Sequence, residues 1–379
     1  GGDAADADTD DLADLTDGVG DAARQAGAGA RSRRRQPIVL PAAQLASAEW
    51  LGTLSPRALA RWHVPRLTIV VITWRRPQSL KRLCAALASA DYFGDTVALK
   101  FTMDAGADVE TRRFVASYRW PHGPKSASVR AVHAGLAVAV AESWQPSSDD
   151  EYAVLLEDDI EVAPSFYSWL KYALLMYRHG DEAAKDPRLI GVSLYTPRLV
   201  EVARPRRRID LHAELGGRPF FQQLPCSWGA LFFPEAWRAF RDYLLHRMAQ
   251  GPAVQVKIPG SVVDGWKGSW KKYLIELMYR RAQWMLYPNF RNQSSFSTNH
   301  LEAGEHIGAK ANSLDHAPAD FTVPLLGRDF VHQLPGRTLE PLAARVVRLD
   351  LFSNRTSDDD AVYKGLDLLA KQTAASGSS

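Results

Sequence analysis

The 379-residue sequence has only two cysteines and no run of 18 apolar residues. Cys84 and Cys226 both stand in apolar surroundings, which is typical of buried thiols and gives no disulfide framework. Without a long apolar run, no segment of this sequence is expected to span a membrane. Net positive charge is small too, because 46 Lys and Arg residues are almost balanced by 43 Asp and Glu residues, and the basic residues 31–35 follow an acidic start. We therefore expect no nucleic-acid partner.

Apolar sequence, in contrast, is plentiful, since 46% of the residues are hydrophobic. That suffices for the core of one large α/β domain or of two ordinary ones. Residues 1–36 are rich in Asp, Ala, Gly and Arg, and they are predicted to be disordered or a linker. The sequence opens Gly-Gly without Met, so we expect an N-terminal signal or anchor to have been removed.

Apolar runs alternate with helical patterns along the chain. Residues 67–73 and 152–156 are continuous apolar runs, typical of strands buried on both faces of a parallel sheet. Further strands are predicted at 96–103, 189–194, 228–233 and 284–287, and helical segments at 42–62, 77–90, 109–118, 128–144, 164–177, 234–248 and 269–283. The alternation predicts a doubly wound α/β domain, a mixed sheet flanked by helices, with ligands at the carboxyl ends of the strands.

The predicted domain covers residues 37–330, with a first half at 37–195 and a second half at 196–330. The second half contains a basic, looped insert at 205–218 and a loop at 255–268. Residues 331–379 are predicted to be an extension, with a polar and mobile tail from residue 353.

Three acidic residues follow the apolar run at 152–156 directly. Glu157, Asp158 and Asp159 would therefore lie at the carboxyl end of a strand. Carboxylate oxygens are the ligands that Mn²⁺ and Mg²⁺ prefer, and such ions keep positions open for the diphosphate of a nucleotide. The alternative is an acidic turn that caps a helix.

Residues 154–166 read VLLEDDIEVAPSF. This stretch resembles the metal-binding motif of the N-acetylglucosaminyltransferase I family and its relatives among GT-A glycosyltransferases, including family-2-type enzymes. The resemblance implies that Asp159 binds the divalent metal, while Glu157 and Asp158 lie near the ribose and the sugar of the donor.

Two earlier segments resemble the same family in order. Residues 70–77 resemble its opening strand and loop, which implies that Thr73 and Arg75 face the nucleotide. The segment that ends at Asp104 resembles its second strand, which implies that Asp104 accepts from the uracil imide and that the donor is a UDP-sugar. From the residues alone, Asp104 could instead begin a turn with Gly106.

Two later segments extend the resemblance. Residues 125–133 lie where the family has a basic contact to the diphosphate, which implies Arg130, although a solvated surface arginine is the alternative. Residues 225–237 resemble the strand and helix that line the acceptor cleft, which implies that Trp228 and Gly229 lie beside the sugar. A core tryptophan is the alternative for Trp228.

The general base is where the sequence departs from the family. An inverting transferase needs a carboxylate to take the acceptor's proton. The resemblance implies one at the start of a helix where this sequence has Lys271 and Lys272. Asp264, in the preceding loop, and Glu276, one turn further along the helix, are the substitutes. Glu276 could also form an ordinary pair with Arg280, four residues later.

Histidines provide the last candidate metal ligands. Some GT-A enzymes take a further ligand from a histidine in the region after residue 287, which implies His300 or His306. A plain loop histidine is the alternative for each.

These observations predict a metal-dependent, inverting glycosyltransferase that moves a sugar from a UDP-sugar, UDP-GlcNAc first, to a hydroxyl of a glycan or glycoprotein acceptor in the Golgi or another secretory lumen. A catalytically degenerate carbohydrate-binding or scaffolding protein is the alternative, supported by Lys271 and Lys272. A nucleotidyltransferase is less favoured, because residues 74–77 contain no glycine.

Overall fold

The computed structural model describes residues 37–133, 135–251, 255–302 and 321–376. The prediction for residues 1–36 lies outside this part of the chain. The chain divides into two units, Gly1–Ile38 and Val39–Ser379, and the fold below is that of the second unit.

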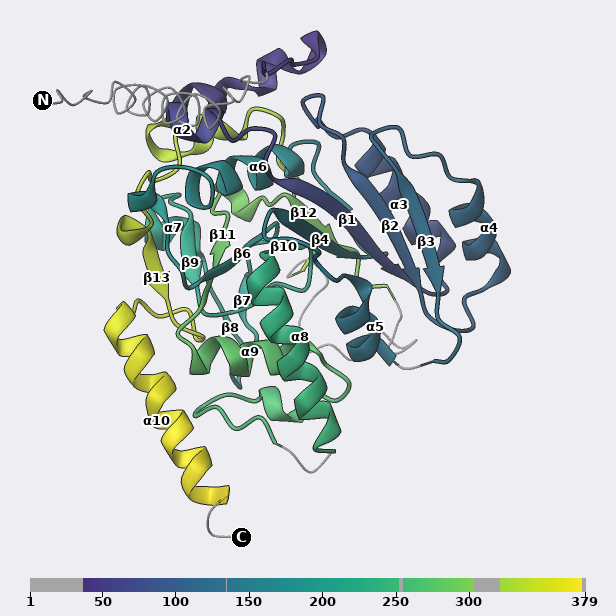
Figure 1. The fold of residues 1–379 in the computed structure, drawn as a ribbon. Helices are drawn as coiled ribbons and strands as arrows, with labels where there is room; N and C mark the ends of the chain where they lie inside the picture. Colours follow the sequence, from purple (N-terminus) through teal and green to yellow (C-terminus); the bar gives the residue numbers. More distant parts are fainter. Residues whose placement is uncertain (1–36, 134, 252–254, 303–320, 377–379) are drawn as a thin grey trace, which may run out of the picture. The chain divides into compact units, whose positions relative to one another are not determined.

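A nine-stranded sheet, in the order β13-β9-β11-β6-β10-β4-β1-β2-β3, runs through this unit (Figure 1). Strands β4, β1, β2 and β3 are parallel neighbours, whereas β10 runs antiparallel to both β4 and β6. The predicted α/β class with a mixed sheet is confirmed. The strands are β1 Arg66–Thr73, β2 Ala98–Met103, β3 Lys125–Val129, β4 Glu151–Glu157, β6 Leu189–Ser193, β9 Phe220–Gln222, β10 Ala230–Phe232, β11 Trp284–Tyr287 and β13 Val347–Leu349; the short pairs outside the sheet are β5 Ile160–Val162 with β12 Ser297–Asn299, and β7 Leu199–Val200 with β8 Arg207–Arg208.

Helices flank the sheet on both faces. In the view of Figure 1, α5, α8 and α9 lie in front of it and α3 and α4 behind it. The α-helices are α2 Pro56–Leu59, α3 Pro77–Ala88, α4 Val109–Ser117, α5 Gly135–Ser143, α6 Phe166–Tyr177, α7 Leu211–Leu215, α8 Pro234–Ala249, α9 Lys271–Arg280 and α10 Asp358–Ser376. The 3-10 helices are η2 Ala42–Ser47, η3 Glu49–Thr53, η4 Glu182–Ala184, η5 Val263–Gly265, η6 Arg291–Gln293, η9 Phe330–Gln333, η10 Pro335–Arg337 and η11 Ala343–Arg345. Within the described residues, every helix is too short or too polar to cross a lipid bilayer.

Three predicted elements differ from the structure. Where a helix was expected at 128–144, strand β3 ends at Val129 and the shorter helix α5 begins only at Gly135. The strand was missed because its residues are largely exposed and polar at the edge of the sheet, so they carry no apolar pattern. The segment 42–62 is two 3-10 helices and one turn of α-helix, and the insert at 205–218 contains β8 and α7.

The C-terminal segment also differs from the expected mobile tail. Strand β13 extends the main sheet beside β9, and α10 packs against α9. Ala361 and Leu368, two helical turns apart, are both buried on this helix. They were missed because apolar residues such as Val362 and Leu366 are exposed on the same helix, so the apolar positions do not mark the buried face.

Helix α6 forms part of the core, since all 12 of its residues are buried. Trp50 and Trp62 of the short N-terminal helical segment stack on each other and cover it, with Trp50 also against Tyr172. Lys171, 1% exposed, forms an ion pair with Asp95. Burial lowers the pKa of Lys171 to about 8 despite this carboxylate. Both cysteines are free and buried, as predicted.

A glycine in the middle of the sheet gives a test of this packing. A Cβ added at Gly191 in β6 would lie 2.3 Å from the carbonyl oxygen of Leu231 in β10. Because that oxygen belongs to the backbone of a paired strand, Gly191→Ala should lower the free energy of unfolding by about 1–3 kcal/mol. Gly52→Ala, where a Cβ meets nothing within 4 Å, should leave it unchanged or slightly raised. Urea denaturation of both variants measures the difference, and equal midpoints would contradict the packing described.

Candidate functional site

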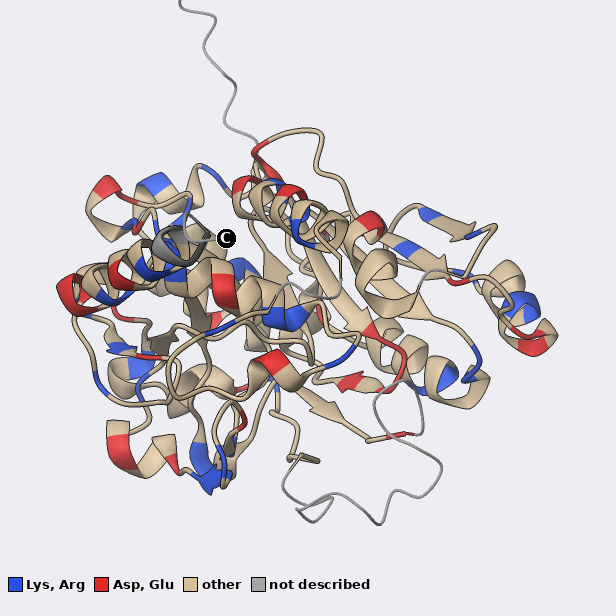
Figure 2. Cartoon of the chain, turned by 90° about the horizontal axis from the view of Figure 1, so that it is seen from below, with Lys and Arg blue, Asp and Glu red and all other residues tan. Residues whose placement is uncertain are grey.

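Acidic and basic positions are interspersed over the described residues (Figure 2). A functional site must therefore be identified from contacts between particular side chains and not from one charged face. The strand order β4-β1-β2-β3 places the segments after these four strands in a row. The register agrees, since Glu157 lies beside Ile72, and Thr73 beside Met103. The candidate residues that follow these strands therefore meet at one edge of the sheet.

Asp158 and Asp159 are both buried at this edge, with exposed fractions of 1% and 6%. Thr73 donates its hydroxyl to Asp158 Oδ2 at 2.6 Å, and the backbone N–H of Trp74 donates to the same oxygen at 3.4 Å. Arg76 forms ion pairs with both carboxylates, its Nη1 lying 2.8 Å from Asp159 Oδ2. The loop after β1 and the turn after β4 are thus joined by charge.

Burial determines the electrostatics of this cluster. Burial is the largest effect on Asp158 and raises the pKa of its carboxyl, while Arg76 opposes that shift. Burial alone would lower the pKa of Arg76, but the two carboxylates raise it above its ordinary value. The acidic pair therefore requires a nearby cation, which in this structure is Arg76.

The donor set is suited to a hard divalent cation. Asp159 Oδ1 is buried yet has no hydrogen-bond partner among the described residues. Two adjacent carboxylates with a free oxygen provide oxygen ligands of the kind Mn²⁺ and Mg²⁺ bind. In the described part of the chain, no three His, Cys, Asp or Glu side chains gather as metal ligands. Water or substrate would fill coordination positions of a bound metal that remain open.

Asp104 lies at the end of β2 and faces two basic side chains. His133 Nδ1 is 2.7 Å from Asp104 Oδ2, and Arg130 Nε is 3.6 Å from Oδ1. Arg130 also pairs with Glu142. The indole of Trp74 stacks on His133 at 5.4 Å between ring centroids. An aromatic face and a carboxylate therefore stand together at the carboxyl ends of β1 and β2.

Arg75 lies beside this group without touching the acidic pair. Its guanidinium is 4.3 Å from the Trp74 ring centroid, and its Nε donates to the carbonyl of Gly106 at 2.9 Å. Trp74 Nε1 donates to the carbonyl of Ala105 at 3.0 Å. The loops after β1 and β2 are thereby fastened to each other.

Trp228 and Gly229 reach the same edge from the opposite direction. They precede β10, which runs antiparallel to β4. A Cβ at Gly229, whose φ is +94°, would lie 3.2 Å from Leu156 Cδ2, so only glycine fits without strain. The Trp228 ring packs edge-on against Tyr195 at 4.7 Å and Phe321 at 5.5 Å. It is half-buried rather than a fully enclosed core residue.

His300 follows β12, which pairs with β5 just after the acidic turn. Its backbone N–H donates to the carbonyl oxygen of Asp159 at 3.1 Å, but its ring is 2.8 Å from Glu161 Oε2. His306 lies outside the described residues.

The two candidate bases have structural partners. Asp264 Oδ1 accepts the backbone N–H of Val256 at 2.7 Å. Both oxygens of the buried Glu276 accept from Arg247, at 3.0 and 3.1 Å, so its partner on the neighbouring helix α8 replaces the expected Arg280. A role as base would require the Glu276 ion pair to open.

Two residues of this region were not singled out from the sequence. Arg76 is one, and its neighbour Arg75 was chosen instead because sequence does not reveal which of two adjacent arginines turns inward. Glu201 is the other, with its carboxylate 2.5 Å from Lys271 Nζ. The neighbour of that lysine, Trp270, lines a small cavity together with Glu157. Glu201 lies in a segment without a recognisable pattern, so no signal marked it.

Comparisons with known proteins give distant similarities. Residues 75–252, less than half of the chain, match the family described as the SPBC1E8.03c C-terminal domain. No curated protein matches the sequence. The solved mannosyltransferase PcManGT from Pyrobaculum calidifontis, in complex with GDP-Man and Mn²⁺, is 16% identical with a TM-score of 0.34, over 51% of this chain and 52% of that one. S. aureus TarS 1-349 in complex with UDP-GlcNAc is 13% identical with a TM-score of 0.36, over 68% of this chain and 63% of that one.

The chain thus spans between about half and two-thirds of these solved structures. At such identities and TM-scores the similarity carries no argument about activity.

The bond between Thr73 and Asp158 can be tested through stability. Thr73→Val removes a hydroxyl that donates to a buried carboxylate, so it should cost about 1.5–3 kcal/mol. Thr102→Val on the adjacent strand is the matched control, because its buried hydroxyl has no hydrogen-bond partner among the described residues. Chemical denaturation should show a large loss only for Thr73→Val. Equal effects of the two substitutions would refute the proposed importance of this hydrogen bond.

Proposed function

We propose that this chain is a metal-dependent glycosyltransferase that transfers a sugar from a UDP-sugar to a hydroxyl of a glycan or glycoprotein. The observation that carries the proposal is the meeting, at one edge of the sheet, of the buried pair Asp158 and Asp159 with the group around Asp104. One cluster offers a place for a cation, and the other offers a carboxylate beside an aromatic face.

Each part of the donor is assigned a neighbour. Asp104 accepts a hydrogen bond from the uracil. Arg130 leaves its ion pair with Glu142 and pairs with the diphosphate instead. Glu157 and Asp158 contact the ribose and the sugar, and Thr73 fixes the Asp158 carboxylate. Arg75 holds the loop that bounds the nucleotide.

Asp159 would hold the metal, with His300 or His306 as further candidate ligands. When bound, the divalent cation supplies Lewis-acid stabilisation of the diphosphate leaving group. Arg76 occupies the same carboxylates in this structure. The metal and Arg76 are therefore two cations that compete for the same pair of carboxylates.

On the acceptor side, Trp228 offers a partly exposed aromatic surface suited to the C–H face of a sugar. Asp264 and Glu276 remain proposed bases, and Glu201 joins them. Its carboxylate is bound to Lys271, the position where the resemblance implies an acid. With Glu201 as the base, the segment after β7 would supply the acid that the resemblance implies at the start of helix α9. UDP-GlcNAc, inversion at the anomeric carbon and the Golgi or another secretory lumen remain part of the proposal.

The competing proposal is a catalytically degenerate sugar-binding protein on the same fold. The partnered states of Asp264 and Glu276 favour it. Donor turnover discriminates the two, because a binding protein would retain UDP without hydrolysing or transferring the sugar.

Metal dependence is tested by calorimetry of UDP binding with and without Mn²⁺. Wild type should bind UDP at least tenfold more tightly with Mn²⁺, and Asp159→Asn should abolish that difference. Arg76→Gln should raise the affinity for Mn²⁺ alone, because it removes the competing cation.

The exposed Asp242→Asn serves as the matched control for loss of one acidic residue, and it should bind as wild type does. Metal-independent UDP binding would remove Asp159 from the proposed role. Absence of UDP binding under both conditions would remove the donor assignment.

Glu201→Gln tests the added candidate base. If Glu201 removes the acceptor's proton, the substitution should lower kcat about 10²–10⁴-fold, with UDP affinity unchanged. Asp264→Asn and Glu276→Gln are assayed in parallel. The base is the residue whose variant loses turnover but still binds UDP. Full turnover by Glu201→Gln would exclude that residue.

A further inference from the structure

A second polar cavity lies far from the edge described above. Its volume is about 260 Å³, and Tyr152, at the amino-terminal end of β4, lines it. Asp158 and Asp159 follow the other end of the same strand. Since Tyr152 and Asp158 are six residues apart, the two places are separated by about 20 Å along the strand.

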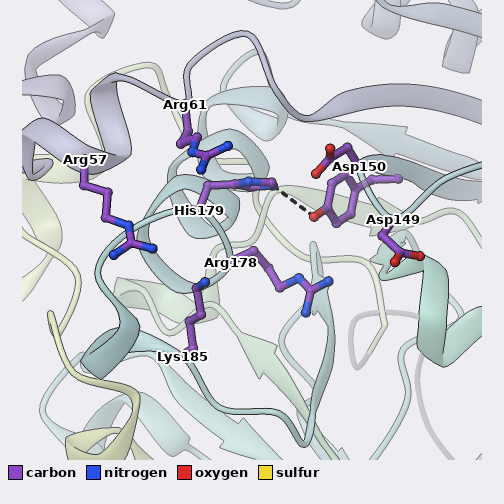
Figure 3. A pocket seen from close by; sticks show the side chains of 8 residues that line it. Arg57, Arg61, Asp149, Asp150, Arg178, His179 and Lys185 are labelled. Atoms are coloured by element: carbon purple, nitrogen blue, oxygen red, sulfur yellow. Dashed lines mark hydrogen bonds between the residues drawn. The ribbon is translucent and has the colours of Figure 1, made fainter. Parts of the chain in front are cut away.

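Four cations converge on this cavity from three segments: Arg57 in α2 and Arg61 just after it, Arg178 at the end of α6, and Lys185 after η4. Figure 3 shows Arg57, Arg61 and Lys185 on one side of His179, and the two aspartates Asp149 and Asp150 on the other. Three of the four cations are therefore grouped apart from the two aspartates, whereas the Arg178 guanidinium extends toward the aspartates' side.

The cationic side is incompletely neutralised. Arg57 and Lys185 share a single carboxylate oxygen of Glu182, at 2.5 and 2.9 Å. Arg178 is paired with Glu235 at 2.6 Å. The exposed Arg61 has no side-chain hydrogen bond or ion pair with any described residue. The two carboxylates Glu182 and Glu235 thus neutralise two of the four cations, while Asp150 adds a negative charge on the far side of His179.

Neutral hydrogen-bonding groups lie between the two sides. The hydroxyl of the buried Tyr152 is 2.9 Å from His179 Nε2. Burial is the main effect that lowers the pKa of His179 to about 4, so the ring is uncharged near neutral pH. Asp149, on the far side, is already paired with Arg238.

We propose that this cavity binds a small oxyanion of the phosphate type, such as phosphate, diphosphate or the phosphate of a phosphorylated sugar. A volume of about 260 Å³ accommodates such a group with its bridging waters, since one water takes about 30 Å³. Guanidinium groups bind phosphate oxygens through paired N–H donors, and Arg61 is available to do so. The proposal is independent of the glycosyltransferase assignment, because it concerns the other end of β4.

Inorganic pyrophosphate is the probe, titrated by calorimetry into the whole chain without divalent cations at low ionic strength. Wild type should bind one equivalent at this cavity. Arg61→Gln and Lys185→Gln should each weaken binding about tenfold, the loss of one charge-assisted contact. Arg112→Gln, an exposed arginine on α4, is the matched control and should bind as wild type does.

Arg130→Gln tests binding at the carboxyl ends of the strands, where a diphosphate could also bind. Unchanged affinity in Arg61→Gln and Lys185→Gln would overturn the proposal, as would loss of binding in Arg130→Gln alone. Because Arg61 is exposed and unpaired among the described residues, its variant should unfold at the wild-type temperature, and this measurement separates lost binding from lost folding.

Discussion

Two carboxylates buried side by side require positive charge close at hand, and this requirement organises the end of the sheet. Arg76 meets it from the loop after β1, while Thr73 binds Asp158 from the last residue of that strand. The ends of β1 and β4 are therefore held together by charge as well as by the backbone ladder. A divalent cation that binds there would meet Arg76, a positive charge already paired with both carboxylates.

Strands with continuous apolar sequence, such as 67–73 and 152–156, were predicted correctly. Burial on both faces of the sheet requires an unbroken run of apolar residues, and such a run can be recognised from the sequence alone. Strand β3 has no such apolar run, because this exposed edge strand is held by backbone pairing with β2 and not by burial of its own side chains. Helix α10 was missed for a related reason, since only a narrow stripe around Ala361 and Leu368 is buried.

The candidate site was predictable where residues directly follow strands. Thr73, Asp104 and Asp158 meet because parallel strands end at a common edge. Ion-pair partners that depend on the direction of a side chain, or on packing between segments distant in sequence, were not predictable. Sequence spacing suggested Arg280 as the partner of Glu276, but tertiary packing brought Arg247 of α8 instead. Likewise, nothing local connects Glu201 with Lys271, 70 residues away.

The reversed direction of β10 has a consequence for how such a site can diversify. In a purely parallel sheet, only loops that follow strands would border the carboxyl ends of the strands, and all of them would contact the same ligand. Because β10 runs the other way, a loop that enters a strand, with Trp228 and Gly229, borders them as well. Substitution or lengthening of that entering loop can therefore alter which second molecule is recognised, while the residues after β1, β2 and β4 stay as they are.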